Sequence, residues 1–193
     1  LVGVARGVLQ QQVRDGKLQL SEGLVATDSL LQLYPQAQFE EHGDALRVLR
    51  QGEAPKRQLM QQFLAEPRSV LVGSQSFWEG IDVPGDALQC VMIDKLPFPP
   101  PNDPLVEARA KRLQEQGRNP FADYFVAEAA VSLKQGGGRL IRSETDRGLL
   151  VVCDPRMATM GYGARLRAAL PPMTPLDGED DAMAWLGELA LAH

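Results

Sequence analysis

Three short apolar runs constrain the fold of this chain most strongly. They extend from Ser69 to Gly73, from Leu88 to Ile93 and from Leu149 to Cys153, and each is almost continuously apolar. A strand without polar alternation is typical of a parallel sheet that is covered on both faces. Helical patterns stand between the runs, so the alternation predicts an α/β fold with a mainly parallel sheet.

The segments around these runs complete the alternation. Pro55 opens a predicted helix with Leu59, Met60, Phe63 and Leu64 on one face. Asp103 and Pro104 fit the N-cap and first position of a helix that ends near Gly117. Further predicted elements are a helix from Val4 to Val13, a weak strand from Gly23 to Thr27, an ambiguous segment from Leu30 to Gln38, a strand from Ala45 to Leu49 and a helix from about Asp123 to Ile141.

Composition limits the class of protein. The 193 residues, 44% of them hydrophobic, suit one globular domain. No apolar run reaches the roughly 18 residues of a membrane span, and no signal peptide is recognisable, so we expect no membrane association. The formal net charge of −5 gives no support for charge-driven binding of nucleic acid.

The cysteines and histidines indicate a reducing compartment and no metal site. Cys90 and Cys153 each lie within or at the end of an apolar run, which predicts buried core thiols rather than a disulfide or metal pair. His42 and His193 are too few and too far apart for a metal site. We therefore expect a cytoplasmic location.

Gln135-Gly-Gly-Gly-Arg139-Leu-Ile-Arg142 is the most informative stretch for function. Consecutive glycines cost a helix roughly 1 kcal/mol each relative to alanine. Either the helix ends at Gln135 and a loop follows, or the backbone closely approaches something. In the second case Gln135, Arg139 and Arg142 share one face, and the two guanidinium groups suit a triphosphate.

Several segments together resemble a known family. Gln135 to Arg142 resembles motif VI of superfamily-two helicases in its XPD/DinG form, and Ser74 to Gly85 resembles motif V. Leu96-Pro97-Phe98, Asp103-Pro104, Asp146-Arg147-Gly148 and Asp154-Pro155-Arg156 are similar to segments that follow these motifs. The resemblance covers about Arg68 to Pro172 and is to the C-terminal RecA-like motor domain of XPD/DinG-family DNA helicases, with the bacterial DinG/YoaA-like branch the most similar.

The resemblance implies a RecA-like, P-loop NTPase-like three-layer α/β/α domain over residues 1–175. The residues of the tail, 176–193, predict an acidic and amphipathic helix that packs either on its own domain or on a neighbour. The resemblance also implies that Gln135, Arg139 and Arg142 face ATP held by a partner motor domain, with an arginine acting as a finger. Glu79, Gly80 and Asp82 would also face the nucleotide, although Asp82 also fits a turn-capping carboxylate.

The resemblance further implies contacts with single-stranded DNA by Ser74, Ser76, Trp78 and Lys95. Hydroxyl and backbone N–H groups at a strand end can bind phosphates without a basic excess. Trp78 fits base stacking but also ordinary packing, and Lys95 fits a DNA contact or a solvated surface lysine equally well. The segment from Leu24 to Ser29 departs from the family pattern of motif IV, in which only Ser29 finds a match, so neither Thr27 nor Ser29 is assigned a DNA contact.

The sequence lacks a G-x-x-x-x-G-K-[ST] loop and an acidic Mg²⁺-binding motif. We therefore expect ATP and Mg²⁺ to be bound mainly by a first RecA-like domain of the same polypeptide, where any iron–sulfur cluster would also lie. The implied parent is a 5′-to-3′ DNA helicase of repair or replication, and this part alone would be inactive. The alternative is a non-enzymatic module that docks on a protein partner through the tail and the Pro97–Pro101 segment.

Overall fold

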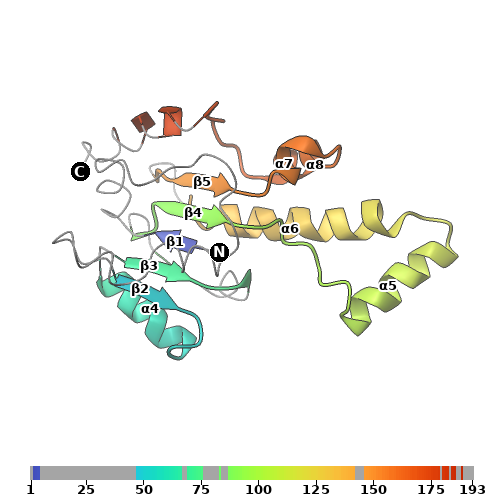
Figure 1. The fold of residues 1–193 in the computed structure, drawn as a ribbon, viewed down its shortest axis with the longest axis horizontal. Coiled ribbons are helices and arrows are strands. Elements are labelled where there is room, and N and C mark those ends of the chain that lie inside the picture. The colour runs from blue at the N-terminus through green and yellow to red at the C-terminus, as the bar shows by residue number, and fades with distance from the viewer. Residues whose placement is uncertain are drawn as a thin grey trace.

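The structure is a computed structural model that describes residues 2–4, 47–66, 69–75, 83, 87–141, 146–178, 180–182, 184–185 and 188. Its elements are β1 (Val2–Val4), β2 (Arg47–Arg50), α4 (Lys56–Ala65), β3 (Ser69–Val72), β4 (Cys90–Ile93), α5 (Pro104–Glu115), the π-helical turn η3 (Phe121–Phe125), α6 (Val126–Gly137), β5 (Leu149–Val152), α7 (Arg156–Thr159) and α8 (Gly163–Ala169) (Figure 1). The segments predicted over Gly23–Thr27 and Leu30–Gln38 lie outside the described residues.

The strands form one sheet in the order β2-β3-β1-β4-β5. β2 is parallel to β3 and β4 is parallel to β5, whereas β1 is antiparallel to both of its neighbours, β3 and β4. Of the five strands in the described residues, four therefore run in one direction, and the prediction of a mainly parallel sheet is confirmed. The helix predicted from Val4 is wrong at that residue, because Val4 ends β1; the rest of that prediction lies outside the described residues.

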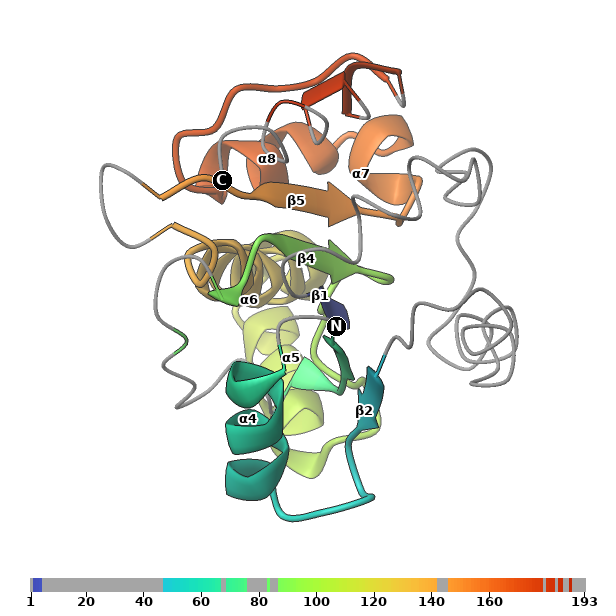
Figure 2. The ribbon, with the colours of Figure 1, turned by 90° about the vertical axis from the view of Figure 1, so that its left-hand side faces the viewer.

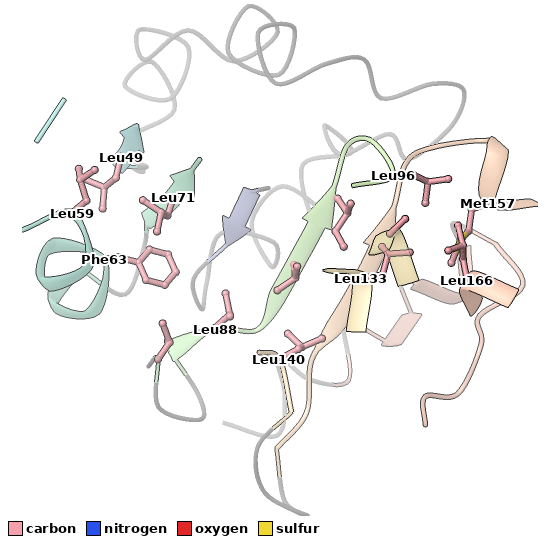
Figure 3. Packing of buried hydrophobic residues seen from close by; sticks show 14 of the residues in the cluster. Leu49, Leu59, Phe63, Leu71, Leu88, Leu96, Leu133, Leu140, Met157 and Leu166 are labelled. Atoms are coloured by element: carbon pink, nitrogen blue, oxygen red, sulfur yellow. The ribbon is translucent and has the colours of Figure 1, made fainter. Parts of the chain in front are cut away.

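One face of the sheet is covered by α4 and α6. The ladder aligns Leu49, Leu71, Gly3, Val91 and Leu150 in one row, so their side-chain positions share a face. The core joins strand residues of this face to both helices; its members include Leu49, Leu71, Val91 and Ile93 from the strands, Leu59 and Phe63 from α4, and Val126, Ala129 and Leu133 from α6. Both helices lie on the same side of the strands in Figure 2, and Figure 3 shows Leu59 and Phe63 beside Leu49 and Leu71.

The centre of the opposite face is buried as well. Cys90 and Met92, which point to that face, are 0% and 5% exposed. Burial raises the pKa of the Cys90 thiol to about 12, so it stays protonated at neutral pH. Cys153 is half-buried, and burial raises its pKa to about 11. Both thiols are free, so the core prediction is confirmed for Cys90 and holds in part for Cys153.

The helix boundaries follow the local sequence where a strong signal exists. The Asp103 carboxylate accepts hydrogen bonds from the N–H groups of Leu105 at 2.9 Å and Val106 at 3.1 Å, as an N-cap should. Gly117 follows the helix with a φ of 70°, a conformation that glycine adopts without strain. These contacts confirm the predicted start and end of α5.

Other predictions need correction. The helix predicted over about Asp123–Ile141 begins earlier, with η3 at Phe121, and ends at Gly137. Leu64 is 42% exposed and does not share the buried face of α4. The short helices α7 and α8 were not predicted, because four and seven residues are too few to show a helical period.

In the tail, residues 180–182, 184–185 and 188 are helical, and the Arg147 guanidinium lies 5.4 Å from the centre of the Trp185 ring. This contact joins the tail to its own domain. Among the described residues, no helix combines the length and apolar character that a membrane crossing requires.

Candidate functional site

The parallel strands end at one edge of the sheet, and polar residues follow each of them there (Figure 1). Gln51 follows β2, Ser74 follows β3 after one glycine, Lys95 follows β4 and Asp154 follows β5. Ligands of open α/β sheets bind outside the carboxyl ends of the strands. This carboxyl edge, with the segments that reach it, is the candidate site.

Gln51 fixes the start of the motif V segment, residues 74–85. Its N–H donates to the Val72 carbonyl at 2.9 Å, and its side-chain Oε1 accepts from the Ser74 N–H at 2.6 Å. The Ser74 N–H is therefore engaged within the domain. This N–H is not one of the backbone donors that the strand end offers to a phosphate, the Ser74 side chain is exposed, and the predicted DNA contact of Ser74 stays a prediction.

A second side-chain bond joins the motif V segment to α6. Gln75 Nε2 donates to Ser132 Oγ at 2.9 Å, across 57 residues of chain. Ser132 lies one helical turn before Gln135, the first residue of the motif VI segment, residues 135–142. The bond thus ties the described start of the motif V segment to the helix that leads into the motif VI segment, and neither Gln75 nor Ser132 was predicted to make it.

The glycines of the motif VI segment do not end the helix at Gln135. α6 continues through Gly136 and Gly137, both buried, and Gly138 caps it. A Cβ on Gly137 would lie 3.2 Å from Leu150 Cδ2 and 3.4 Å from Leu170 Cδ2. The interpretation of close backbone approach is confirmed. In the described residues the approached partners are β5 and the segment after α8.

Arg139 lies in a tight turn just beyond α6. Its N–H donates to the Gly136 carbonyl at 3.3 Å, and the Leu140 N–H donates to the Gly137 carbonyl at 3.2 Å. Leu140 is 2% exposed and anchors the turn in the core. Gln135 is exposed and Arg139 is half-buried. Because α6 ends at Gly137, this turn, rather than a continuous helical face, positions the Arg139 side chain.

Most of the other predicted site residues lie outside the described part of the chain. These are Ser76, Trp78, Glu79, Gly80, Asp82 and Arg142. Within the motif V segment, Val83 is described; it is 3% exposed and belongs to the core. The roles of the six residues stay predictions.

Lys95 is exposed, and the loop that carries it is held by Asp154. The Asp154 carboxylate accepts from the Leu96 N–H at 2.9 Å and from Arg156 Nη2 at 2.6 Å. Burial opposes ionisation of this carboxyl, but the hydrogen bonds from Arg156 and Leu96 outweigh it and lower the pKa of Asp154 below its ordinary value. The Arg156 guanidinium also lies 5.5 Å from the centre of the Phe98 ring.

The sequence assigned no role to the Asp154–Arg156 pair beyond the resemblance of Asp154-Pro155-Arg156. The signal that could have pointed to Asp154 was a charged residue directly after the apolar run that ends at Cys153. As for metals, the described residues contain no group of three or more histidine, cysteine or acidic side chains arranged to hold an ion.

Comparison with known proteins identifies the family. The model of the helicase C-terminal domain matches residues 24–173. The ATP-dependent DNA helicase YoaA of Haemophilus influenzae is 48% identical over 135 residues, which are 70% of this chain and 21% of that protein. The YoaA protein of Escherichia coli is 51% identical over 127 residues, which are 66% of this chain and 20% of the relative.

The ATP-dependent helicase DinG of Mycobacterium tuberculosis is 44% identical over 145 residues, covering 75% of this chain and 22% of its own length. The chain thus spans about a fifth of the length of the relatives it matches. Together, the RecA-like α/β sheet and the match over residues 24–173 show that the chain belongs to the helicase C-terminal domain family of DinG-like proteins.

Proposed function

We propose that this chain is the second motor domain of an ATP-dependent DNA helicase. It would supply arginines to an ATP site between two RecA-like domains and part of a single-stranded DNA track. The observation that carries the proposal is the Gln75–Ser132 hydrogen bond, which joins the start of the motif V segment to the helix that leads into motif VI. Relatives named ATP-dependent DNA helicases support the same assignment.

At the nucleotide, the chain contributes positive charge. In ATP hydrolysis water attacks the γ-phosphorus, the bond to the β–γ bridging oxygen breaks, and ADP leaves with the negative charge. Arg139 and Arg142 would stabilise the charge that develops on the transferred group, which elsewhere changes rates by about 10³ to 10⁵. Gln135 would line the same cleft, and Glu79, Gly80 and Asp82 would face the nucleotide from the motif V segment.

Mg²⁺ would neutralise phosphate charge from the first motor domain. A phosphate-binding loop and an acidic magnesium motif are missing from this sequence. The arginine and glutamine side chains proposed to face the nucleotide suit phosphate oxygens rather than a hard cation. These residues would therefore orient a triphosphate that the first motor domain holds.

On the DNA side, the carboxyl edge would contact the strand through Ser74, Ser76, Trp78 and Lys95. Among these, the Ser74 side chain and Lys95 are exposed at that edge. Local contacts of this kind suit a chain with a net charge of −5, which does not attract DNA by overall charge. Translocation from 5′ to 3′ and a role in DNA repair or replication belong to the proposal.

Arg139→Lys in the full-length protein tests this function. Lysine keeps the charge but loses the planar, bidentate guanidinium, so we expect DNA-stimulated ATP turnover to fall by at least about tenfold. Arg118→Lys is the matched control, because Arg118 forms an exposed ion pair with Asp123 on the turn after α5. Equal turnover by the Arg139→Lys variant and wild type would contradict the proposed role of Arg139.

A further inference from the structure

The start of the motif V segment is held on both sides by side-chain hydrogen bonds. Gln51 Oε1 accepts from the Ser74 N–H at 2.6 Å, and the next residue, Gln75, donates to Ser132 Oγ at 2.9 Å. The first bond ties the segment to the end of β2. The second ties it to α6.

α6 is suited to carry a displacement as one body. Its buried face, with Ala129 and Leu133 both 0% exposed, packs in the core. Its last turn packs against β5, where a Cβ on Gly137 would lie 3.2 Å from Leu150 Cδ2. Ser132 lies in α6 and Arg139 in the turn that directly follows it, so a displacement of α6 as one body would move both residues.

We propose that Gln75 and Ser132 are positioning residues that couple the DNA-contacting edge to the arginines of the ATP site. The inference rests on the proposed function, since it takes Ser74 as a strand contact and Arg139 as a phosphate contact. When DNA binds at Ser74, the adjacent Gln75 holds Ser132, and α6 keeps Arg139 in the geometry that hydrolysis needs. Without the bond, DNA and ATP still bind, but DNA binding stimulates ATP hydrolysis less.

The bond lies in an exposed environment and is of ordinary strength, which sets the size of the effect. Its loss should lower the DNA-stimulated kcat about three- to tenfold, the change in rate that one such bond supplies. A purely structural role would instead lower stability, or change basal and stimulated turnover by the same factor.

The test measures ATP turnover by the full-length protein against oligo-dT concentration, for Gln75→Leu, Ser132→Ala and the double variant. We expect stimulated kcat to fall more than basal turnover in each single variant, and the double variant to be no slower than either. Such non-additivity is the signature of a direct interaction, whereas intermediacy in space alone shows no coupling. The apparent Kd for oligo-dT should stay within about twofold of wild type.

Two further variants sharpen the result. Ser132→Thr keeps the hydroxyl and should restore stimulated turnover, while Gln114→Leu, at an exposed glutamine of α5, should leave both rates unchanged. Thermal midpoints within about 2 °C of wild type would show that the variants fold.

Multiplicative effects in the double variant, or unchanged stimulation in both single variants, would overturn the coupling. If wild-type protein shows no stimulation by oligo-dT, the proposed function fails first, and this inference fails with it.

Discussion

The Asp154 carboxylate shows how one residue at a strand end organises its surroundings. Four donors surround it, namely the N–H groups of Leu96 and Arg156 and the Nε and Nη2 groups of the Arg156 guanidinium. The bond to Leu96 fixes the backbone directly after Lys95, so the position of a predicted DNA contact depends on a residue 58 positions away from Leu96. Charge-assisted bonds of this kind are stronger than neutral ones.

Asp154→Asn should lower the free energy of unfolding at pH 7 by about 1–3 kcal/mol, because it removes the charge that four donors share. The folded-state pKa of Asp154 lies below its ordinary value, so its stabilisation is present above that ordinary value, about 3.9. The stabilisation is lost as pH falls through the lowered pKa. Urea unfolding of both proteins at pH 7 and near pH 2.5 tests this, and a difference that does not shrink at low pH would refute it.

The site residues differ in how far the sequence alone could locate them. Arg139 and Ser74 follow from motifs, because their neighbours in sequence carry the pattern. Gln75, Ser132 and the side chain of Gln51 act through contacts between distant segments, and no local pattern records the partner of such a bond.

At the scale of elements, strong local signals predicted the structure well. The apolar runs became β3, β4 and β5, and the Asp103-Pro104 cap became the start of α5. β1 could not be predicted as a central antiparallel strand, since three residues carry no period and pairing depends on distant strands. The end of α6 was misplaced because Leu140 and Ile141 extend the apolar pattern, whereas the chain turns after Gly137.

A substitution at Gly148 tests the packing between the motif VI turn and the residues that lead into β5. A Cβ at this position would lie 2.5 Å from both Cγ and Cδ1 of Leu140, which is 2% exposed. Gly148→Ala should therefore displace Leu140 and its neighbour Arg139, and should cost about 1–3 kcal/mol of unfolding free energy. Stimulated ATP turnover of the full-length protein should fall with it.

Gly161→Ala is the matched control, because a Cβ at Gly161 meets no atom within 4 Å. Its effect on the unfolding free energy should remain within about 0.5 kcal/mol. If chemical denaturation gives the two alanine variants equal stability, the packing of Leu140 against Gly148 is not as tight as described.

At the scale of the whole molecule, we propose that the chain is one of two motor domains that together form the ATP site. It spans about a fifth of the length of its relatives, and its sequence lacks the phosphate-binding loop and the acidic magnesium motif. The family and the α/β class could be recognised from the order of the motifs. The geometry of the proposed interdomain ATP site could not, because part of that site would belong to another domain.

The 193-residue chain by itself should not hydrolyse ATP or unwind DNA. Without a cradle for the phosphates, Arg139 and Arg142 have no bound triphosphate to act on. A phosphate-release assay on the purified chain, with and without single-stranded DNA, measures this. Turnover by the chain alone that is abolished by Arg142→Ala would show a complete site here and would contradict the half-site account.

The most direct test of the central claim is single-turnover ATP hydrolysis by the full-length protein carrying Arg142→Ala, with and without single-stranded DNA. We expect DNA-stimulated hydrolysis to fall by a factor of about 10³ or more while ATP binding is retained, because the arginine acts on the transition state. Unchanged hydrolysis would contradict it, and a protein-docking role through the tail and the Pro97–Pro101 segment would become the better explanation.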